Sequence, residues 1–419
     1  MRLGSGKLRA RAAAGCAASV LIVAGSGCGL LPGQEPAGST PAAAPTAPVI
    51  SPVPAPPPTP IPTPTPTPGK GPGCAAVRCT SVLVTGDMLV HAQLWQQARE
   101  DAAATGAQGM DFVPLLEGQR RYVAGSDLAI CHLETPVAGP GGPFSAYPSF
   151  NVPPQIIPAA RDLGYQACTT ASNHTIDQGT AGLVRTLDAL DAAGMKHTGS
   201  YRTEAEAQGV LILDTDAARI ALVSATYGLN GLRPEAGWQV DLLDAPAMIA
   251  KARTARALGA DIVLGAMHAG DEYSSAPNAQ QQDVARALAD SGEFSLVYGH
   301  HSHSVLPIES YNGTWIVYGL GNGITELSPW YTVNNEGLLV RVQFRQDDAG
   351  NWTAGDLAWA PSVMVRNPYR WCSVAADALQ GPCAGAAADA ATRQRTRAAV
   401  ESMGAAGAGA HELLISREP

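Results

Sequence analysis

Three histidines within four residues close an apolar run in the second half of the chain. The segment Leu296–His303 reads Leu-Val-Tyr-Gly-His-His-Ser-His, and its first half has the pattern of a buried strand. Packing explains this sequence poorly, because burying three imidazoles at the tip of a strand removes their hydration. Neutral imidazoles that converge on a metal ion explain it better. The segment therefore predicts a strand that ends at a metal site, with His300, His301 and His303 at its tip.

Four other apolar runs end in side chains of the kinds that bind metals or transfer protons. They are Asp87 after the first run, His132 and Glu134 after the second, Asn173, His174 and Asp177 after the third, and His268 and Glu272 after the fourth. Open α/β sheets place their sites at the carboxyl ends of strands. The mixture of Asp, Glu, Asn and His suits two divalent ions of Mn, Zn or Fe. No cysteine joins the set, which argues against a structural zinc site.

Two neighbouring residues of this set are expected to differ in role. Asn173 would bind a metal through its carbonyl oxygen, while His174 would face the substrate and protonate a leaving group. The alternative for His174 is a polar residue at the entry to a helix.

Strand-like and helix-like segments alternate through the body of the chain. The strand-like runs are Ser81–Thr85, Asp127–Cys131, Tyr165–Thr169, Arg219–Ala225, Asp261–Met267 and Phe294–Tyr298. Helical spacing of apolar residues predicts helices over Thr180–Ala193 and Ala279–Ser291. Asn312-Gly313 predicts a hairpin, a second hairpin is expected around Asp347–Asn351, and the Ala-rich segment Ala384–Met403 predicts a peripheral helix. The pattern predicts a layered α/β sandwich that is mostly parallel with antiparallel parts.

The first 73 residues have the composition of a targeting segment and a tether. Residues 1–27 carry four cations followed by an apolar stretch, which is typical of a signal peptide. Small residues before Cys28 resemble the cleavage site of bacterial lipoproteins, which predicts lipidation of Cys28; the alternative is an ordinary secretory signal. Residues 28–73 are rich in Pro, Thr and Ala and are expected to form an extended linker. The domain would then span residues 74–419 on the extracytoplasmic face of the cell membrane.

Charge and cysteine content agree with that location. Residues 1–27 hold four cationic and no acidic side chains, so their removal changes the formal net charge from −9 to −13. An acidic body of this kind argues against nucleic acid as a partner. The spacing favours disulfides between Cys74 and Cys79 and between Cys372 and Cys383. Cys131 and Cys168 lie in apolar runs, where they either pair or stay as buried thiols.

The ordered motifs together resemble those of the CapA family of capsule and poly-γ-glutamate biosynthesis proteins. The matching motifs are Gly86-Asp87, Leu133-Glu134, Asn173-His174 with Asp177-x-Gly179, His268-x-Gly270-x-Glu272, Gly299-His-His-x-His303 and Leu320-Gly-Asn322. The resemblance covers roughly Ser81 to Asn322. It implies a four-layer α/β/β/α sandwich of the calcineurin-like metallophosphatase type, tethered to a membrane.

The resemblance also implies a role for each matching residue. The metal ligands would be Asp87, Glu134, Asn173, His268, His301 and His303, with His174 as the acid; His132, Asp177, Glu272, His300 and Asn322 would face the substrate or support the ligands. His132 stands where the family usually has Asn. Two function classes follow. One is a metal-dependent hydrolase that acts on a phosphoester or a glutamyl-polymer bond. The other is a non-catalytic accessory protein that organises capsule-polymer synthesis or export, with synthesis and export proteins as partners.

Overall fold

The computed structural model describes residues 74, 76, 78–327, 332–378 and 381–417 of the 419-residue chain. The expected signal peptide 1–27, the lipidated Cys28 and the linker 28–73 lie outside the described residues. Within the described part, no helix is both long enough and apolar enough to span a bilayer.

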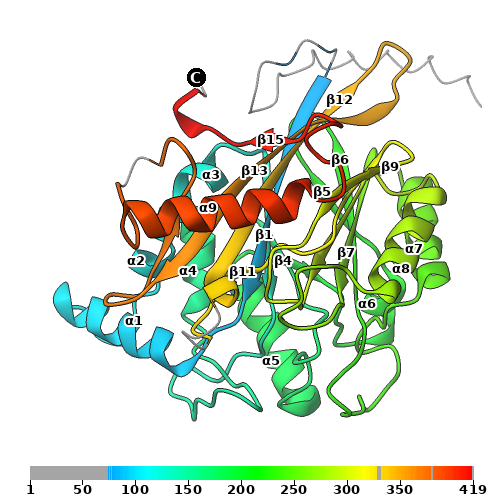
Figure 1. The fold of residues 1–419 in the computed structure, drawn as a ribbon. Coiled ribbons are helices and arrows are strands. Elements are labelled where there is room, and N and C mark those ends of the chain that lie inside the picture. Colours follow the sequence, from blue (N-terminus) through cyan, green and yellow to red (C-terminus); the bar gives the residue numbers. More distant parts are fainter. Residues whose placement is uncertain (1–73, 75, 77, 328–331, 379–380, 418–419) are drawn as a thin grey trace, which may run out of the picture. The chain divides into compact units, whose positions relative to one another are not determined.

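Two β-sheets form the centre of the domain (Figure 1). The first sheet runs in the order β14-β13-β12-β1-β2-β3-β4, and β11 and β15 attach to it at β1 and β13. Its strands are β1 (Arg78–Met88), β2 (Leu128–Leu133), β3 (Ala167–Thr169), β4 (Lys196–Thr198), β11 (Asn322–Ile324), β12 (Glu336–Gln346), β13 (Trp352–Val365), β14 (Arg370–Ser373) and β15 (His411–Glu412). The strands from β1 to β4 are parallel, whereas β12, β13 and β14 are antiparallel to their neighbours in the sheet order.

The second sheet runs in the order β5-β6-β7-β8-β10-β9. Its strands are β5 (Leu211–Asp214), β6 (Arg219–Thr226), β7 (Ile262–His268), β8 (Leu296–His300), β9 (Ile308–Tyr311) and β10 (Thr314–Val317). The pairs β6–β7, β7–β8 and β8–β10 are parallel. Strands β9 and β10 form the hairpin predicted at Asn312-Gly313, and both turn residues have positive φ, as a tight hairpin turn requires.

Helices cover the outer face of each sheet, and three apolar layers fill the space between elements. The helices are α1 (Ala92–Ala104), α2 (Val113–Leu116), α3 (Arg120–Ala124), α4 (Ile156–Leu163), α5 (Gly179–Ala192), α6 (Glu204–Gln208), α7 (Ala245–Ala257), α8 (Ala279–Asp290) and α9 (Ala386–Glu401), with short 3-10 turns at Glu117–Gln119, Thr332–Asn335 and Ile415–Arg417. One core joins the first sheet to α1–α5, and a third joins the second sheet to α7 and α8. The second lies between the sheets and includes Val400 of α9, so this helix packs against that core and not on an outer face. This arrangement confirms the expected four-layer α/β/β/α sandwich.

The strands that the sequence did not predict are short or polar. Strand β4 has the sequence Lys-His-Thr and β11 the sequence Asn-Gly-Ile, so neither carries an apolar run. Both exist because a neighbouring strand offers an unpaired edge, which is a tertiary effect. The six strand-like runs, the two hairpins and the helices expected over Thr180–Ala193, Ala279–Ser291 and Ala384–Met403 are all present within a few residues of their predicted bounds.

The segment Leu320–Ile324 joins the two sheets at the edge where the histidines emerge. The N–H of Leu320 donates to the carbonyl of Gly299 in the second sheet, and the N–H of Asp87 in the first sheet donates to the carbonyl of Gly321, both at 3.0 Å. The backbones approach closely here. A Cβ added to Gly86 would lie 2.4 Å from the Gly321 oxygen, so only glycine fits. The sheets are therefore held together beside the predicted site.

Three disulfides are present in the described part of the chain. Cys74–Cys79 and Cys372–Cys383 match the pairs that the spacing favours. Cys131 and Cys168, for which a buried thiol was the alternative, form the third pair. They lie opposite each other in the β2–β3 ladder, with Cα atoms 4.4 Å apart. This bond links two neighbouring strands directly before their site residues.

Candidate metal centre

Asp87 lies at the end of β1 and is fully buried between the two sheets. Its Oδ1 accepts a hydrogen bond from Nδ1 of His300 at 2.6 Å, and its Oδ2 accepts one from the backbone N–H of His301 at 3.0 Å. Burial by itself would raise the pKa of Asp87, but the neighbouring His300, His303 and His132 hold it well below its ordinary value. A buried carboxylate kept ionised by histidines is ready to bind a cation.

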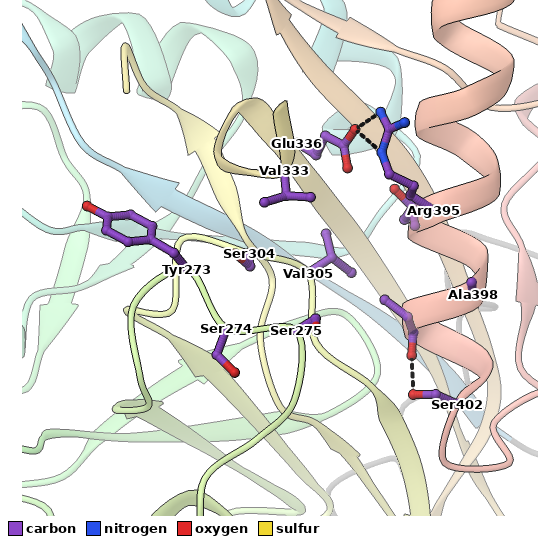
Figure 2. A pocket seen from close by; sticks show the side chains of 12 residues that line it. Tyr273, Ser274, Ser275, Ser304, Val305, Val333, Glu336, Arg395, Ala398 and Ser402 are labelled. Carbon is purple, nitrogen blue, oxygen red and sulfur yellow. Dashed lines mark hydrogen bonds and ion pairs between the residues drawn. The ribbon is translucent and has the colours of Figure 1, made fainter. Parts of the chain in front are cut away.

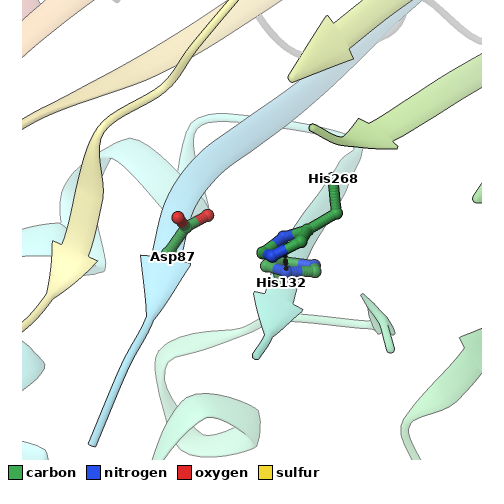
Figure 3. A group of neighbouring side chains, drawn as sticks. All are labelled: Asp87, His132 and His268. Atoms are coloured by element: carbon green, nitrogen blue, oxygen red, sulfur yellow. Dashed lines mark hydrogen bonds between the residues drawn. The ribbon is translucent and has the colours of Figure 1, made fainter. Parts of the chain in front are cut away.

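A chain of side chains runs from β2 across to β7 and on to the loop after β3. Nδ1 of His132 lies 2.8 Å from the Thr169 hydroxyl, and its Nε2 lies 3.0 Å from Nδ1 of His268. Nε2 of His268 then donates to Oδ1 of Asn173 at 2.9 Å. Figure 3 shows His132 and His268 side by side, with Asp87 from β1 beside them. The ring of His132 also stacks on that of His300, with centroids 4.1 Å apart.

Glu134, directly after β2, has no hydrogen-bond partner for either carboxylate oxygen among the described residues, although both oxygens are buried. Burial raises its pKa to about 7. Its Oε1 lies 3.8 Å from Nε2 of His303 and 3.9 Å from Nε2 of His268. A buried carboxylate without partners costs free energy unless a ligand satisfies it, and this unsatisfied position is the strongest indication of a cation site.

The loop after β8 holds two histidines in a strained backbone conformation. His301 has φ +82° and His303 has φ +50°, a region that costs a residue with a side chain about 1–3 kcal/mol. Nδ1 of His303 lies 3.0 Å from Oδ1 of Asn322 and 3.4 Å from Oδ2 of Asp87. Burial opposes the charged form of His303, but Glu134 and Asp87 outweigh it and raise its pKa to about 9. Burial lowers the pKa of His301 to about 4, and its buried Nδ1 has no hydrogen-bond partner in the described part of the chain.

These residues form two sets of donors that share one carboxylate. Glu134, His268 and His301 make one set, and Asp87, Glu134 and His303 make the other; within each set the donor atoms lie within 4.8 Å of one another. A third set of Asp87, His132 and His268 has the same spacing. The donors are the oxygen and imidazole types that Mn, Zn and Fe accept. The unsatisfied oxygens of Glu134 and the proton that His303 carries between two carboxylates both fit a site built for cations.

A cavity of about 470 Å³ opens beside these donors. His174 lines it, and Nδ1 of His174 donates to Oδ2 of Asp177 at 2.7 Å. Oδ2 of Asp177 also accepts the backbone N–H of Phe150, so the carboxylate is fixed. Burial opposes the charged form of His174, but the hydrogen bond to Asp177 and the charge of Glu134 raise its pKa. With Nδ1 engaged, Nε2 is the nitrogen that can act on a ligand in the cavity.

All the sequence-predicted site residues except Cys28, which lies outside the described part, gather at this edge of the sandwich. Asp87, Glu134, Asn173, His268, His301 and His303 are mutually close, and His132, His300 and Asn322 contact them directly. His174 and Asp177 form a pair on the cavity wall, and Glu272 lines its exposed side. His132 lies closer to the candidate metal ligands than a residue that only supports them would, because it belongs to one donor set itself.

Several residues of the site carried no usable sequence signal. Tyr227 places its ring 4.5 Å from that of His301, and Asn230 accepts a hydrogen bond from the Asn173 amide at 3.2 Å. Tyr147 lines the cavity. A single Tyr or Asn in a loop resembles any other surface residue in sequence, so only the return of that loop to the strand ends reveals its role.

Comparison with known proteins identifies the chain's relatives. Residues 81–326 match the family described as bacterial capsule synthesis protein PGA_cap. Over 206 residues the chain is 29% identical to the PGA biosynthesis protein CapA of Bacillus subtilis (strain 168), a match that covers 46% of this chain and 50% of that protein. Over 215 residues it is 28% identical to a protein of Mycobacterium tuberculosis named "Probable polyglutamine synthesis accessory protein", covering 48% of this chain and 56% of that one. The chain spans about half the length of these curated relatives.

Among solved structures, the chain is similar to a calcineurin-like phosphoesterase, YfkN, from Bacillus subtilis. The identity is 15% and the TM-score 0.45, over 76% of this chain and 96% of that one. The family match covers more than half of the chain and includes every strand end that contributes to the centre. The chain belongs to the family of bacterial capsule synthesis proteins described as PGA_cap.

Proposed function

We propose that this protein is a cell-envelope hydrolase that uses two divalent metal ions to cleave a phosphoester or a glutamyl-polymer bond. The observation that carries the proposal is the buried carboxylate of Glu134, which has no hydrogen-bond partner among the residues that the structure describes and belongs to two sets of metal-type donors. A structural site closes its coordination with protein ligands, whereas this one borders a cavity of about 470 Å³ that can admit a substrate.

In this proposal the two donor sets hold the two ions. One set would be Glu134, His268 and His301 with the Asn173 oxygen, and the other Asp87, Glu134 and His303. When bound, such ions supply Lewis-acid polarisation of a substrate oxygen and a nucleophile near neutral pH. Mn, Zn and Fe all suit these donors.

His132 orients His268 in this scheme. In the metal-free protein, Nε2 of His268 donates to Asn173, so its Nδ1 accepts from His132. If Nε2 of His268 held a metal it would carry no proton, and the Nδ1–H of His268 would then donate to Nε2 of His132. The Thr169 hydroxyl ends the chain, since it can donate onward to the carbonyl of Cys131. The hydrogen bonds therefore reverse their direction without moving any heavy atom, which keeps the imidazole of His268 oriented.

His174 would act as the general acid. Its Nε2 delivers a proton to the leaving oxygen or nitrogen as the scissile bond breaks, water supplies the hydroxyl to the other product, and solvent returns a proton to the imidazole. Asp177 stabilises the charged imidazole and fixes its orientation. A positioned acid of this kind contributes roughly 10²–10⁴-fold in rate.

Metal content and turnover test the proposal together. The purified chain, reconstituted with Mn or Zn, is analysed for metal and assayed on phosphoesters and γ-glutamyl peptides. We expect two ions per chain and turnover that chelation abolishes. His268→Ala should lower both metal content and turnover, whereas the exposed His411→Ala should change neither. Absence of bound metal after reconstitution would refute the proposal.

A second candidate is a non-catalytic accessory protein that organises capsule-polymer synthesis or export. The name of the Mycobacterium tuberculosis relative supports it. In this case the metal would stabilise the fold, and the partners would be synthesis and export proteins. A His174→Ala variant that still supports polymer production in cells would favour the accessory function over the hydrolase.

The envelope location is part of the proposal. Lipidation of Cys28 and the linker 28–73 would tether the domain to the extracytoplasmic face of the cell membrane. Three disulfides in the domain support an oxidising compartment. The acidic net charge supports partners other than nucleic acid.

A further inference from the structure

A second cavity, of about 390 Å³, lies between α9 and the loops that follow β7 and β8 (Figure 2). Tyr273 lines both this cavity and the one at the metal centre. In the loop after β8, His303 lines the metal-side cavity and the next residue, Ser304, lines the second one. In the loop after β7, Glu272 lines the first and Ser274 the second. The two loops that carry metal-type residues therefore divide two adjoining cavities.

The wall of this second cavity contains polar groups without partners. The hydroxyls of Ser304 and Thr396 are buried, with residue exposures of 3% and 1%, and neither has a hydrogen-bond partner among the described residues. Buried hydroxyls of this kind normally have partners, so a ligand that supplies them gains free energy. Val305, Val333 and Ala398 add apolar surface around them. The lining suits a chain with methylene groups and amides.

The cavity also offers an arginine side chain, which the described lining of the metal-side cavity lacks. Arg395 forms an ion pair with Glu336, and both line the cavity. The Arg395 side chain is 41% exposed, whereas that of Glu336 is only 4% exposed. A ligand in the cavity would therefore contact the guanidinium of the ion pair and not its carboxylate. Among the described residues that line the metal-side cavity, none is Lys or Arg. A carboxylate-bearing chain that extends beyond the metal centre would therefore meet a second cationic group, the Arg395 guanidinium, in this cavity.

We propose that the second cavity is a subsite for the distal part of a carboxylate-bearing, amide-linked chain whose other end lies at the metal centre. The chain would pass Tyr273, donate and accept hydrogen bonds at Ser304 and Thr396, and place a carboxylate near Arg395. This inference rests on the proposed function, since it extends the glutamyl-polymer substrate from the metal centre into a named second site.

Binding of chains of two lengths tests the subsite. The probes are a dimer and an octamer of γ-linked glutamate, titrated calorimetrically into the Mn-loaded full chain. Ala398→Trp fills the cavity from its exposed rim. Ala390→Trp places the same side chain at an exposed position of α9 that does not line the cavity and serves as the matched control. Thr396→Val removes one hydroxyl without changing the size of the side chain.

We expect the octamer to bind the wild type about tenfold more tightly than the dimer, as two additional satisfied hydrogen bonds imply. Ala398→Trp should abolish that tenfold gain, Thr396→Val should reduce it several-fold, and Ala390→Trp should leave it unchanged; none of them should alter dimer affinity or metal content. Equal octamer affinity in Ala398→Trp and Ala390→Trp would overturn the subsite.

The hydrolase and the subsite fail in different ways. Octamer binding in the expected pattern without any cleavage would support the subsite and refute the proposed hydrolysis. Cleavage of a phosphoester, together with octamer binding no tighter than dimer binding, would support the hydrolase and refute the subsite.

Discussion

Replacing Glu134 by Gln should stabilise the metal-free protein at alkaline pH and weaken the metal-loaded one. Both oxygens of this carboxylate are buried, with no hydrogen-bond partner within the described ranges, and burial raises its pKa from 4.5 to about 7. Because the folded-state pKa lies above the unfolded one, ionisation opposes folding. The penalty is absent below pH 4.5, grows as the pH rises, and is complete above about pH 7.

The size of the effect follows from that shift. A displacement of about 2.5 pKa units corresponds to about 3 kcal/mol of lost stability at pH 8. Gln resembles the protonated acid in shape and polarity, so Glu134→Gln should recover most of this loss, which raises the melting temperature by about 4 °C for a domain of this size. At pH 4.5 the variant and the wild type should melt together.

Added metal should reverse the order of thermal stability, so that the wild type becomes more stable than Glu134→Gln. A ligand that binds only the folded state at a concentration 100 times its dissociation constant stabilises by about 2.7 kcal/mol. The amide is a poorer metal ligand than the carboxylate, so Glu134→Gln should gain less than the wild type from Mn. Thermal melts at pH 4.5 and 8, with chelator or with Mn, give the four comparisons, and Glu204→Gln, at an exposed position of α6 away from the cavity, is the control. A variant that melts below the wild type at pH 8 in chelator would refute the reasoning.

The remaining predictions concern the acid, the buried disulfide and the anchor. His174→Ala should keep its metal but lose about 10²–10⁴-fold in turnover, measured by elemental analysis and initial rates; loss of metal would instead make His174 a ligand. Asp177→Asn should lower the pKa of His174, so that the alkaline limb of the pH–rate profile moves to lower pH. Replacing both Cys131 and Cys168 by Ala should cost about 4 kcal/mol in chemical unfolding, from the 37-residue separation of the cysteines; an unchanged midpoint would contradict this. Cys28→Ala should release the protein from the membrane fraction, whereas unchanged fractionation would exclude the lipid anchor.

The strand ends of the site could be predicted from sequence because the signal is local. An apolar run followed by a polar metal-type residue, as at Asp87 or His268, marks both the strand and the point where its side chains leave the core. Parallel strands then bring these points to one edge. The four layers follow from the alternation of such runs with helical segments.

Contacts between distant segments were not predictable in the same way. His132 meets His268 across 136 residues of sequence, and this contact depends on how the two sheets pack. The bond between Cys131 and Cys168 depends on the register of β2 against β3, which their sequences do not specify. The cavity beside α9 requires that helix to lie near the loops after β7 and β8, although its Ala-rich sequence shows only that it is a helix.

The junction of the two sheets at Leu320–Ile324 separates positions where the amino acid can change from positions where it cannot. Backbone contacts at Gly86 leave no room for even a methyl group. Any larger residue at this position would therefore push the two sheets apart beside the metal-type residues. The loops that carry Tyr147 and Asn230 are under no such restriction, because they reach the cavity from outside the junction. Changes in these loops can therefore alter the shape of the cavity while the cluster of metal-type residues at the junction stays the same.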